Sequence, residues 1–156
     1  MEQPIKVRKF VSSDMERIEE IEKDCIRYMT PFSFLSLYYE IVPECSLVAE
    51  ADRKVVGYIT ANLRKTRDGN AEGHILGIAV DQAHRRKGVG TELMKQIINV
   101  FRKKRVKQLS LEVKVNNTAA RRFYSSGGFE EVCILKGYYR MRGYAEDAVL
   151  MIKNIE

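Results

Sequence analysis

Residues 78–91, with the sequence IAVDQAHRRKGVGT, place a short apolar segment before a basic turn that contains two glycines. The apolar residues predict the end of a buried strand. A helix is expected to begin near Gly88, because apolar side chains recur on one helix face at Val89, Leu93, Ile97 and Phe101. The first N–H groups of a helix have no partner within it and lie at the positive end of its dipole. The turn therefore predicts a seat for a pyrophosphate group.

Two nucleotide-binding patterns can be compared with these glycines. A P-loop requires G-x-x-x-x-G-K-[ST], and a Rossmann turn requires G-x-G-x-x-G. In this chain Gly88-x-Gly90 is followed by Thr91, Glu92 and Leu93, so neither pattern is present. ATP and NAD are disfavoured as ligands. A plain helix start, in which glycine serves only the turn, stays open on these residues alone.

The rest of the chain alternates between strand and helix patterns. Strands are expected over residues 6–10, 46–50, 55–63, 73–80, 108–115, 129–135 and 148–152. Helices are expected over residues 13–26, 30–43 and 117–126, besides the one that begins near Gly88. Ser13 and Glu16 have the spacing of a capping box. This order mixes hairpins with two crossovers, which predicts an α/β fold with a mixed sheet covered by helices, in one domain over residues 1–156.

Composition narrows the classes of protein. The chain is 45% hydrophobic, has no apolar run near the roughly 18 residues of a membrane span, and begins without the blocks of a signal peptide. We therefore expect a cytoplasmic protein that does not enter a membrane. Cys25, Cys45 and Cys133 form no C-x-x-C pair, and with His74 and His84 as the only histidines a metal site is not expected.

The net charge of +6 favours anionic partners. The densest basic run is Arg102-Lys103-Lys104-Arg105, with Lys107 beyond it. One interpretation is a solvated helix end, where cations complement the helix dipole. The other is a weak contact with RNA or the ribosome.

A second motif lies about 25 residues beyond the first. Residues 117–129 fit N-x-x-A-x-x-x-Y-x-x-x-G-F, and Arg85-x-x-Gly88-x-Gly90 fits [QR]-x-x-G-x-[GA]. In these motifs the chain resembles the GNAT N-acetyltransferase superfamily over nearly its whole length. It is most similar to RimI-like and archaeal-type protein N-terminal acetyltransferases, which residues 111–113, 136–139 and 146–148 also match.

The resemblance implies a GNAT fold, whose mixed sheet is splayed between the fourth and fifth strands and flanked by about four helices. It also implies acetyl-CoA as the acetyl donor, with coenzyme A as product. The expected cofactor contacts are Ile78, Ala79, Val80, Arg86, Lys87, Gly88, Val89, Gly90, Thr91, Asn117 and Tyr124. For Asn117, a plain N-cap role is an alternative that does not exclude the first.

Three residues are candidates for proton transfer. Glu112 matches the general base of RimI-like enzymes and Tyr124 their general acid, while some relatives place a tyrosine or histidine that faces the substrate at the position of His74. Because Leu109, Leu111 and Val113 share one face of their strand, Glu112 belongs to the other. A solvated glutamate, a packed tyrosine and a satisfied strand histidine remain the alternatives. No cysteine has an activating neighbour in the predicted cleft, so direct transfer in a ternary complex is expected.

The resemblance also predicts the substrate, the N-terminal α-amino group of a protein or peptide. Tyr138 and Tyr139 are expected in a loop that holds the peptide, with a structural loop as the alternative. Phe32 and Phe34 are expected to flank an apolar first side chain such as methionine, unless both belong to the core. One alternative is an acetyltransferase that acts on lysine side chains, a polyamine or another small amine. The other is a non-catalytic domain that senses acyl-CoA.

Overall fold

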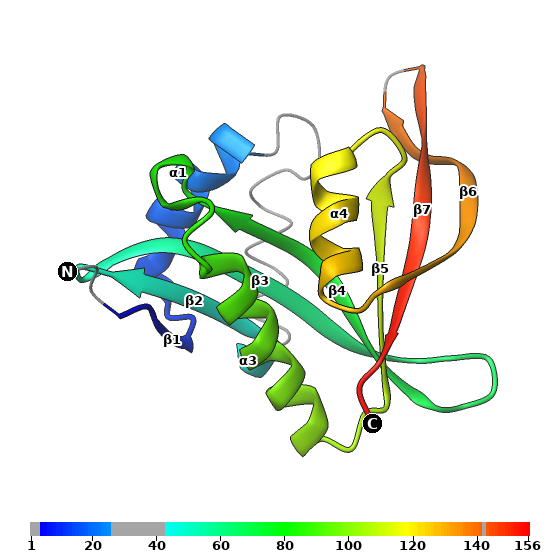
Figure 1. Cartoon of the computed structure of the whole chain (residues 1–156), viewed down its shortest axis with the longest axis horizontal. Coiled ribbons are helices and arrows are strands. Elements are labelled where there is room, and N and C mark those ends of the chain that lie inside the picture. The colour runs from blue at the N-terminus through cyan, green and yellow to red at the C-terminus, as the bar shows by residue number, and fades with distance from the viewer. Residues whose placement is uncertain (1–3, 26–42, 142) are drawn as a thin grey trace. The chain divides into compact units, whose positions relative to one another are not determined.

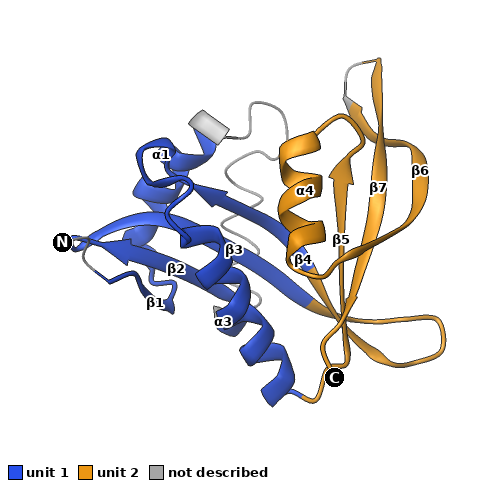
Figure 2. Ribbon diagram, in the orientation of Figure 1, with its two compact units in different colours: residues 1–62, 75–104 blue, residues 63–74, 105–156 orange. Residues whose placement is uncertain are grey.

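The computed structural model describes residues 4–25, 43–141 and 143–156 (Figure 1). Contacts divide the chain into two compact units, shown in two colours in Figure 2. Unit 1 comprises residues 1–62 and 75–104, and unit 2 comprises residues 63–74 and 105–156. The two long strands in the middle of the sequence contribute residues to both units. That residues 1–156 form one domain stays a prediction.

The described residues form one seven-stranded sheet with the strand order β1-β2-β3-β4-β5-β7-β6. The strands are β1 (Lys6–Lys9), β2 (Ser46–Ala51), β3 (Lys54–Lys65), β4 (Ala71–Val80), β5 (Gln108–Lys114), β6 (Glu130–Met141) and β7 (Tyr144–Asn154). The helices are α1 (Met15–Cys25), α3 (Val89–Lys103) and α4 (Thr118–Ser126). The predicted α/β class with a mixed sheet is confirmed, since β4 and β5 are parallel and the other recorded pairs antiparallel. The helix expected over residues 30–43 falls outside the described residues.

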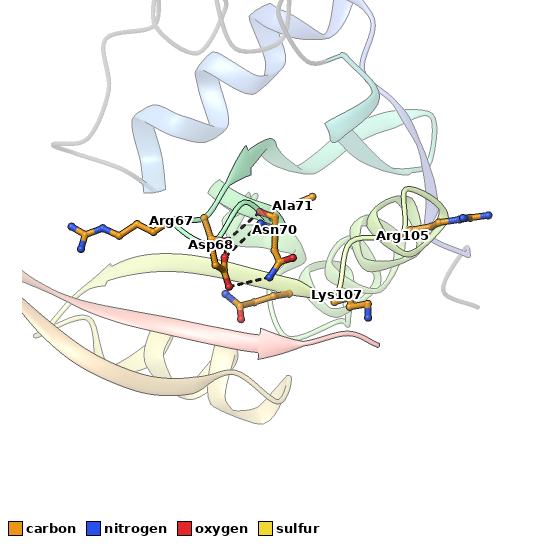
Figure 3. Close-up of a pocket in the computed structure, with 8 residues that line it drawn as sticks. Arg67, Asp68, Asn70, Ala71, Arg105 and Lys107 are labelled. Atoms are coloured by element: carbon orange, nitrogen blue, oxygen red, sulfur yellow. Dashed lines mark hydrogen bonds between the residues drawn. The ribbon is translucent and has the colours of Figure 1, made fainter.

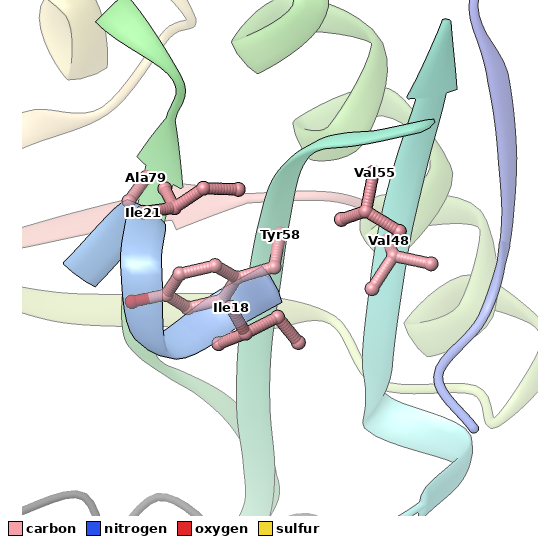
Figure 4. Packing of buried hydrophobic residues seen from close by; sticks show 6 residues of the cluster. All are labelled: Ile18, Ile21, Val48, Val55, Tyr58 and Ala79. Atoms are coloured by element: carbon pink, nitrogen blue, oxygen red, sulfur yellow. The ribbon is translucent and has the colours of Figure 1, made fainter. Parts of the chain in front are cut away.

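Unit 1 is built on three antiparallel strands, in which β1 pairs with β2 and β2 with β3. One apolar cluster joins α1 to this sheet and consists of Ile18, Ile21, Val48, Val55, Tyr58 and Ala79. Figure 4 shows the Tyr58 ring beside Ile18 of α1. Burying such side chains is worth roughly 1.5–3 kcal/mol each, so this cluster is a main source of stability for the unit.

Helix α3 has a fully buried apolar face, formed by Leu93, Ile97 and Phe101 as the 3.6-residue spacing predicts. Its first turn approaches β3 closely at Gly57. A Cβ atom at Gly57 would lie 3.0 Å from the Ala79 carbonyl oxygen and 3.1 Å from Cγ1 of Val89. Glycine at this position therefore lets the start of α3 lie directly against the strand.

Unit 2 is dominated by β5, β6 and β7. All seven residues of β5 pair with β7, and β6 and β7 form a long hairpin. Leu109, Leu111 and Val113 are buried on one face of β5. Helix α4 supplies Tyr124, whose ring contacts that of Phe129 edge to face with 5.8 Å between the centroids. The alternation predicted for β5 is confirmed, and it leaves Ser110 and Glu112 on the opposite face.

The parallel pairing between β4 and β5 is short. Its pairs are Gly73 with Leu109 and His74 with Ser110. In the part of the chain that the structure describes, residues 75–80 have no ladder partner in β5. This limited pairing fits the predicted GNAT sheet, whose fourth and fifth strands separate.

Three local expectations were wrong. Tyr138 and Tyr139 lie within β6 rather than in a loop, because the β6–β7 hairpin extends to Met141. Residues 64 and 65 belong to β3, which extends two residues beyond the strand expected over residues 55–63. Just before α1, the Asp14 carboxylate accepts a hydrogen bond from the Val11 N–H at 2.9 Å. The observed contact therefore joins residues 11 and 14, two positions before the predicted capping box of Ser13 and Glu16.

Candidate active site

The turn before α3 is anchored by Asp81. Its N–H donates to the Val56 carbonyl at 2.7 Å, and its carboxylate accepts hydrogen bonds from Arg17 at 2.9 Å and His84 at 3.1 Å. Burial alone would raise the pKa of Asp81, but His84 and Arg17 together hold that pKa below its ordinary value. The start of the turn is thus fixed to unit 1 by main-chain and charged contacts.

The backbone of this turn has the conformation that an anion seat requires. Gly88 lies in the left-handed region with φ 81°, and its carbonyl accepts the N–H of Glu92 at 3.0 Å, which begins α3. A Cβ atom at Gly88 would find no other atom within 4 Å, so the space beside the helix N-terminus is open. The side chains of Arg86 and Lys87 are exposed next to it. These residues fit a pyrophosphate group.

The other cofactor candidates surround or follow this turn. Ala79 is buried, and Ile78 and Val80 are half-buried at the end of β4. The Asn117 side chain accepts the Ala120 N–H at 3.2 Å and caps α4, which confirms the N-cap role. A contact between Asn117 and a cofactor stays a prediction, as do those of Val89, Gly90 and Thr91. The substrate candidates Phe32 and Phe34 lie outside the described residues.

Unit 2 joins two of the predicted catalytic residues directly. His74 Nε2 lies 2.5 Å from Glu112 Oε2, and both side chains are almost entirely buried. The register explains the contact, because His74 pairs with Ser110 and Glu112 follows two residues later on the same face. A carboxylate hydrogen-bonded to an imidazole can take up and pass on a proton.

A polar network that the sequence did not predict surrounds this pair. Arg64 donates through Nε to Glu72 at 2.7 Å and through Nη2 to Ser110 at 3.1 Å, and the same Nη2 lies 3.9 Å from Glu112 Oε1. Gln108 donates to the other oxygen of Glu72 at 2.7 Å. Alternation in the strand patterns was the available signal for Glu72, Ser110 and Gln108. Arg64 was missed because the strand expected over residues 55–63 ended before it.

Three tyrosines are the remaining candidates. Tyr124 is 9% exposed, and burial raises the pKa of its hydroxyl to about 12. The pKa of Tyr139 is raised further above its ordinary value, first by burial and then by the charges of Tyr138, Glu112, Tyr124 and Glu146. Tyr138 is 46% exposed, and its ring meets that of Tyr139 at 5.0 Å between centroids. The phenols of Tyr124 and Tyr139 therefore keep their protons near neutral pH.

Unit 2 also contains a basic pocket of about 680 Å³, shown in Figure 3. It is lined by Thr66, Arg67, Asp68, Asn70, Ala71, Arg105, Lys107 and Gln108.

In the basic segment of residues 102–107, two cations have acidic partners. Lys107 lies 2.8 Å from Glu156, and Lys104 lies 3.6 Å from Glu44. Arg102 and Lys103 lie in the last turn of α3, as the helix-end interpretation expects. A contact between residues 102–107 and RNA or the ribosome stays a prediction.

The described residues can also be compared with the requirements of a metal site, a reactive cysteine and a membrane helix. They contain no group of three His, Cys, Asp or Glu side chains that could hold a metal ion. Of the cysteines described, Cys133 is exposed and Cys45 is buried. Burial, followed by the charge of Glu44, raises the pKa of the Cys45 thiol to about 11. No described helix is both long and apolar enough to cross a membrane.

The fold is that of the acyltransferase class of enzymes, and the turn before α3 and the His74–Glu112 pair are its candidate binding and catalytic residues. The model of the acetyltransferase (GNAT) family matches residues 15–129, and the chain belongs to this family. It is therefore an acetyltransferase, which sets aside a purely acyl-CoA-sensing role. The resemblance inferred from the two motifs is confirmed.

The relatives extend over nearly the whole chain. An uncharacterised N-acetyltransferase of Methanocaldococcus jannaschii is 39% identical over 148 residues, which cover 94% of this chain and 90% of the relative. An N-alpha-acetyltransferase of Sulfurisphaera tokodaii is 30% identical, with 94% and 90% covered. Among solved structures, Ard1 of Thermoplasma volcanium has a TM-score of 0.87 at 28% identity, with 97% and 98% covered.

Proposed function

We propose that this acetyltransferase transfers the acetyl group of acetyl-CoA to the N-terminal α-amino group of a protein or peptide. The observation that carries the proposal is the 2.5 Å contact between His74 and Glu112. This contact supports a role for Glu112 and His74 as proton acceptors on the polar face of β5. The name N-alpha-acetyltransferase of the Sulfurisphaera relative supports the choice of amine.

Acetyl-CoA would supply an activated thioester and a thiol leaving group. Its pyrophosphate would be held by the N–H groups at the start of α3, where Gly88 leaves open space, and by the exposed side chains of Arg86 and Lys87. The backbone of residues 78–80 has no ladder partner in β5 among the described residues, so it is suited to bind the amides of the pantetheine arm.

The amine must lose a proton before it can attack. An α-amino group has a pKa of about 7.7–8.0, so a substantial fraction is already neutral near pH 7.5 and a carboxylate–imidazole pair suffices as acceptor. The amine nitrogen would bond to the acetyl carbon as the carbon–sulfur bond breaks, and the proton lost from nitrogen would pass to the Glu112–His74 pair. The sulfur would leave as a thiolate that accepts a hydrogen bond from the hydroxyl of Tyr124. Because the transfer is direct, no cysteine of the chain carries the acetyl group.

The peptide would be held by Tyr138, the more exposed of the adjacent tyrosines on β6. The preferred substrate begins with methionine followed by an apolar residue, which is the specificity that the sequence predicts from the resemblance at residues 30–34. Burying a methionine side chain is worth roughly 1.5–3 kcal/mol, or about ten- to a hundred-fold in specificity. Lysine side chains, with a pKa of about 10.4, are a poorer match to this acceptor.

Competition between two peptides tests this function. Met-Leu and Ser-Ser peptides of otherwise equal sequence are mixed with acetyl-CoA and the purified chain, and the product is located by mass spectrometry. An N-terminally blocked peptide with internal lysines serves as the control. We expect acetylation at the α-nitrogen of the Met-Leu peptide. Preference for Ser-Ser contradicts the predicted specificity, and acetylation of the blocked peptide alone contradicts the α-amino substrate.

A further inference from the structure

The guanidinium group of Arg64 lies between two carboxylates of unit 2. Its Nε is 2.7 Å from Glu72, and its Nη2 is 3.9 Å from Glu112. Glu112 uses its other oxygen for His74, so its two oxygens have separate partners. A single cation thus compensates a buried carboxylate that has no part in the proposed chemistry and one that is central to it.

The position of Arg64 is itself fixed. Glu72 is 4% exposed and accepts from Arg64 with one oxygen and from Gln108 with the other. Ser110, also buried, accepts from Nη2 of Arg64 and is hydrogen-bonded to Glu72. Burial would raise the pKa of Glu72, but the hydrogen bonds from Arg64, Gln108 and Ser110 together hold it below the ordinary value. A charged Glu72 therefore keeps Arg64 in one orientation.

Arg64 is not needed to fill the core. Its side chain is 42% exposed near the end of β3, and its guanidinium group contacts Glu72 and Ser110. If Arg64 served packing alone, an uncharged side chain of similar length could replace it without loss of activity. The geometry instead gives it an electrostatic role toward Glu112.

We infer that Arg64 is a positioning residue of the acetyltransferase: held by Glu72 and Ser110, it orients the Glu112 carboxylate so that Oε2 faces His74 Nε2. This inference rests on the proposed function of Glu112 and His74 in accepting the proton of the amine. Without Arg64, Glu112 would lose the cation beside Oε1, and its side chain would be free to turn away from His74. The active orientation would then be populated less.

Several other ionisable groups face the same part of unit 2 and bear on the pH dependence. They are His74 and Glu72 on β4, Lys114 on β5, Tyr139 on β6, Glu146 on β7 and Tyr124 on α4. Lys114 is already paired with Glu146 at 2.7 Å and lies 5.7 Å from the centre of the Tyr139 ring. Arg64 is therefore the cation whose removal acts most directly on Glu112.

The test compares Arg64→Met, Arg64→Lys and Lys65→Met. Lys65 carries the same charge at the next position of β3, is exposed, and belongs to the opposite side of the strand. We expect Arg64→Met to lower kcat/KM for peptide about 10-fold, with the acid limb of its pH profile moved to higher pH. Arg64→Lys should recover part of the loss, since it retains the charge. Lys65→Met should match the wild type in activity and melting temperature, and the KM for acetyl-CoA should stay unchanged in all three. Arg64→Met should also lower the melting temperature, because Glu72 loses its cation, so the kinetics are measured well below that temperature.

Two results separate the possible failures. A pH profile of Arg64→Met that coincides with the wild type, while Glu112→Gln is impaired, overturns the inference about Arg64 and leaves the proposed function intact. Full activity of Glu112→Gln overturns the proposed function itself. Glu72→Gln provides a second variant, because loosening Arg64 should reproduce the shift of the acid limb in smaller degree. An equal loss of kcat/KM in Lys65→Met would mean that the effect comes from the net charge of the protein and not from the position of Arg64. This result would also overturn the inference.

Discussion

The two units contribute different chemical groups to the proposed reaction, main-chain groups in unit 1 and side chains in unit 2. In unit 1 the seat at the start of α3 consists of main-chain N–H groups and a glycine in the left-handed region. In unit 2 the chemistry belongs to side chains, with His74 and Glu112 in contact and Arg64 beside them. A seat built mainly of backbone is expected to be more sensitive to an added Cβ atom at Gly88 than to the loss of one nearby charge such as Arg86 or Lys87, whereas a side-chain site depends on the charges and proton acceptors of single residues. Substitutions can therefore separate binding from catalysis.

The largest effect is expected at Glu112. Replacing it by glutamine retains its size but removes the proton acceptor, which typically contributes about 10²–10⁴-fold. We expect Glu112→Gln to lower kcat by this order while acetyl-CoA binds as before. Steady-state kinetics with calorimetry of acetyl-CoA binding measures both. Glu130→Gln, at an exposed position of β6, is the matched control, and turnover of Glu112→Gln within a few-fold of it would assign Glu112 to structure.

The next effect tests the backbone seat through two glycines of the same conformation. Gly88 has φ 81° and Gly69 has φ 82°, and a Cβ atom at either would meet nothing within 4 Å. Valine should therefore cost both positions a similar backbone strain, of the order of 1–2 kcal/mol. Only Gly88→Val should weaken acetyl-CoA binding, by more than about 10-fold, because it alone fills the space beside the helix N-terminus.

Calorimetry measures the acetyl-CoA affinity of both folded variants, and denaturant unfolding compares their free energies of unfolding. Equal loss of acetyl-CoA affinity in Gly69→Val and Gly88→Val would mean that strain, and not access to the pyrophosphate, is the cause. Gly90→Val should resemble Gly88→Val if both glycines of the turn face the cofactor.

A smaller effect is expected at Tyr124. Its hydroxyl, with a pKa raised to about 12 by burial, is suited to donate a hydrogen bond rather than to lose its proton. Tyr124→Phe should therefore lower kcat by about 10- to 100-fold with unchanged acetyl-CoA binding. The ring contact with Phe129 would be retained. A variant with wild-type kcat but a lower melting temperature would show that Tyr124 serves packing alone.

The smallest effects concern acid stability and compare Asp81 of unit 1 with Glu72 of unit 2. The folded-state pKa of each is below its ordinary value, 3.8 for Asp81 and 4.5 for Glu72. Each therefore stabilises the fold above that value, and the contribution is lost as the pH falls through the folded-state pKa. We expect Asp81→Asn and Glu72→Gln to lose about 1 kcal/mol at pH 7. Urea unfolding at a series of pH values downward from pH 7 measures it, and a difference from wild type that does not shrink as the pH falls contradicts this origin.

The sequence predicted those parts of the fold that depend on local patterns. The apolar spacing from Val89 to Phe101 identified α3, the Asn117 cap and its following residues identified α4, and alternation placed Glu112 opposite Leu111. These signals are strong because each lies within one element and reflects burial on one face.

The remainder depends on contacts between elements. The distance between His74 and Glu112 follows from the β4–β5 register, which neither strand specifies alone. Arg64 became part of the network because β3 extends into a polar segment whose composition is typical of a loop. Tyr138 and Tyr139 entered β6 because the strand continues through a register irregularity between Leu135 and Tyr139. Pairing with a neighbour decides such strand ends more than composition does.

The short β4–β5 pairing has a consequence for the order of folding. Strands β6 and β7 join through a tight local connection, whereas His74 and Glu112 are 38 positions apart. Closing that larger loop costs about 2 kcal/mol more in chain entropy. The β6–β7 hairpin should therefore form early and the His74–Glu112 contact late, since non-local parallel pairing is intrinsically slow. In refolding experiments, recovery of acetyltransferase activity should lag behind recovery of the circular dichroism of the sheet.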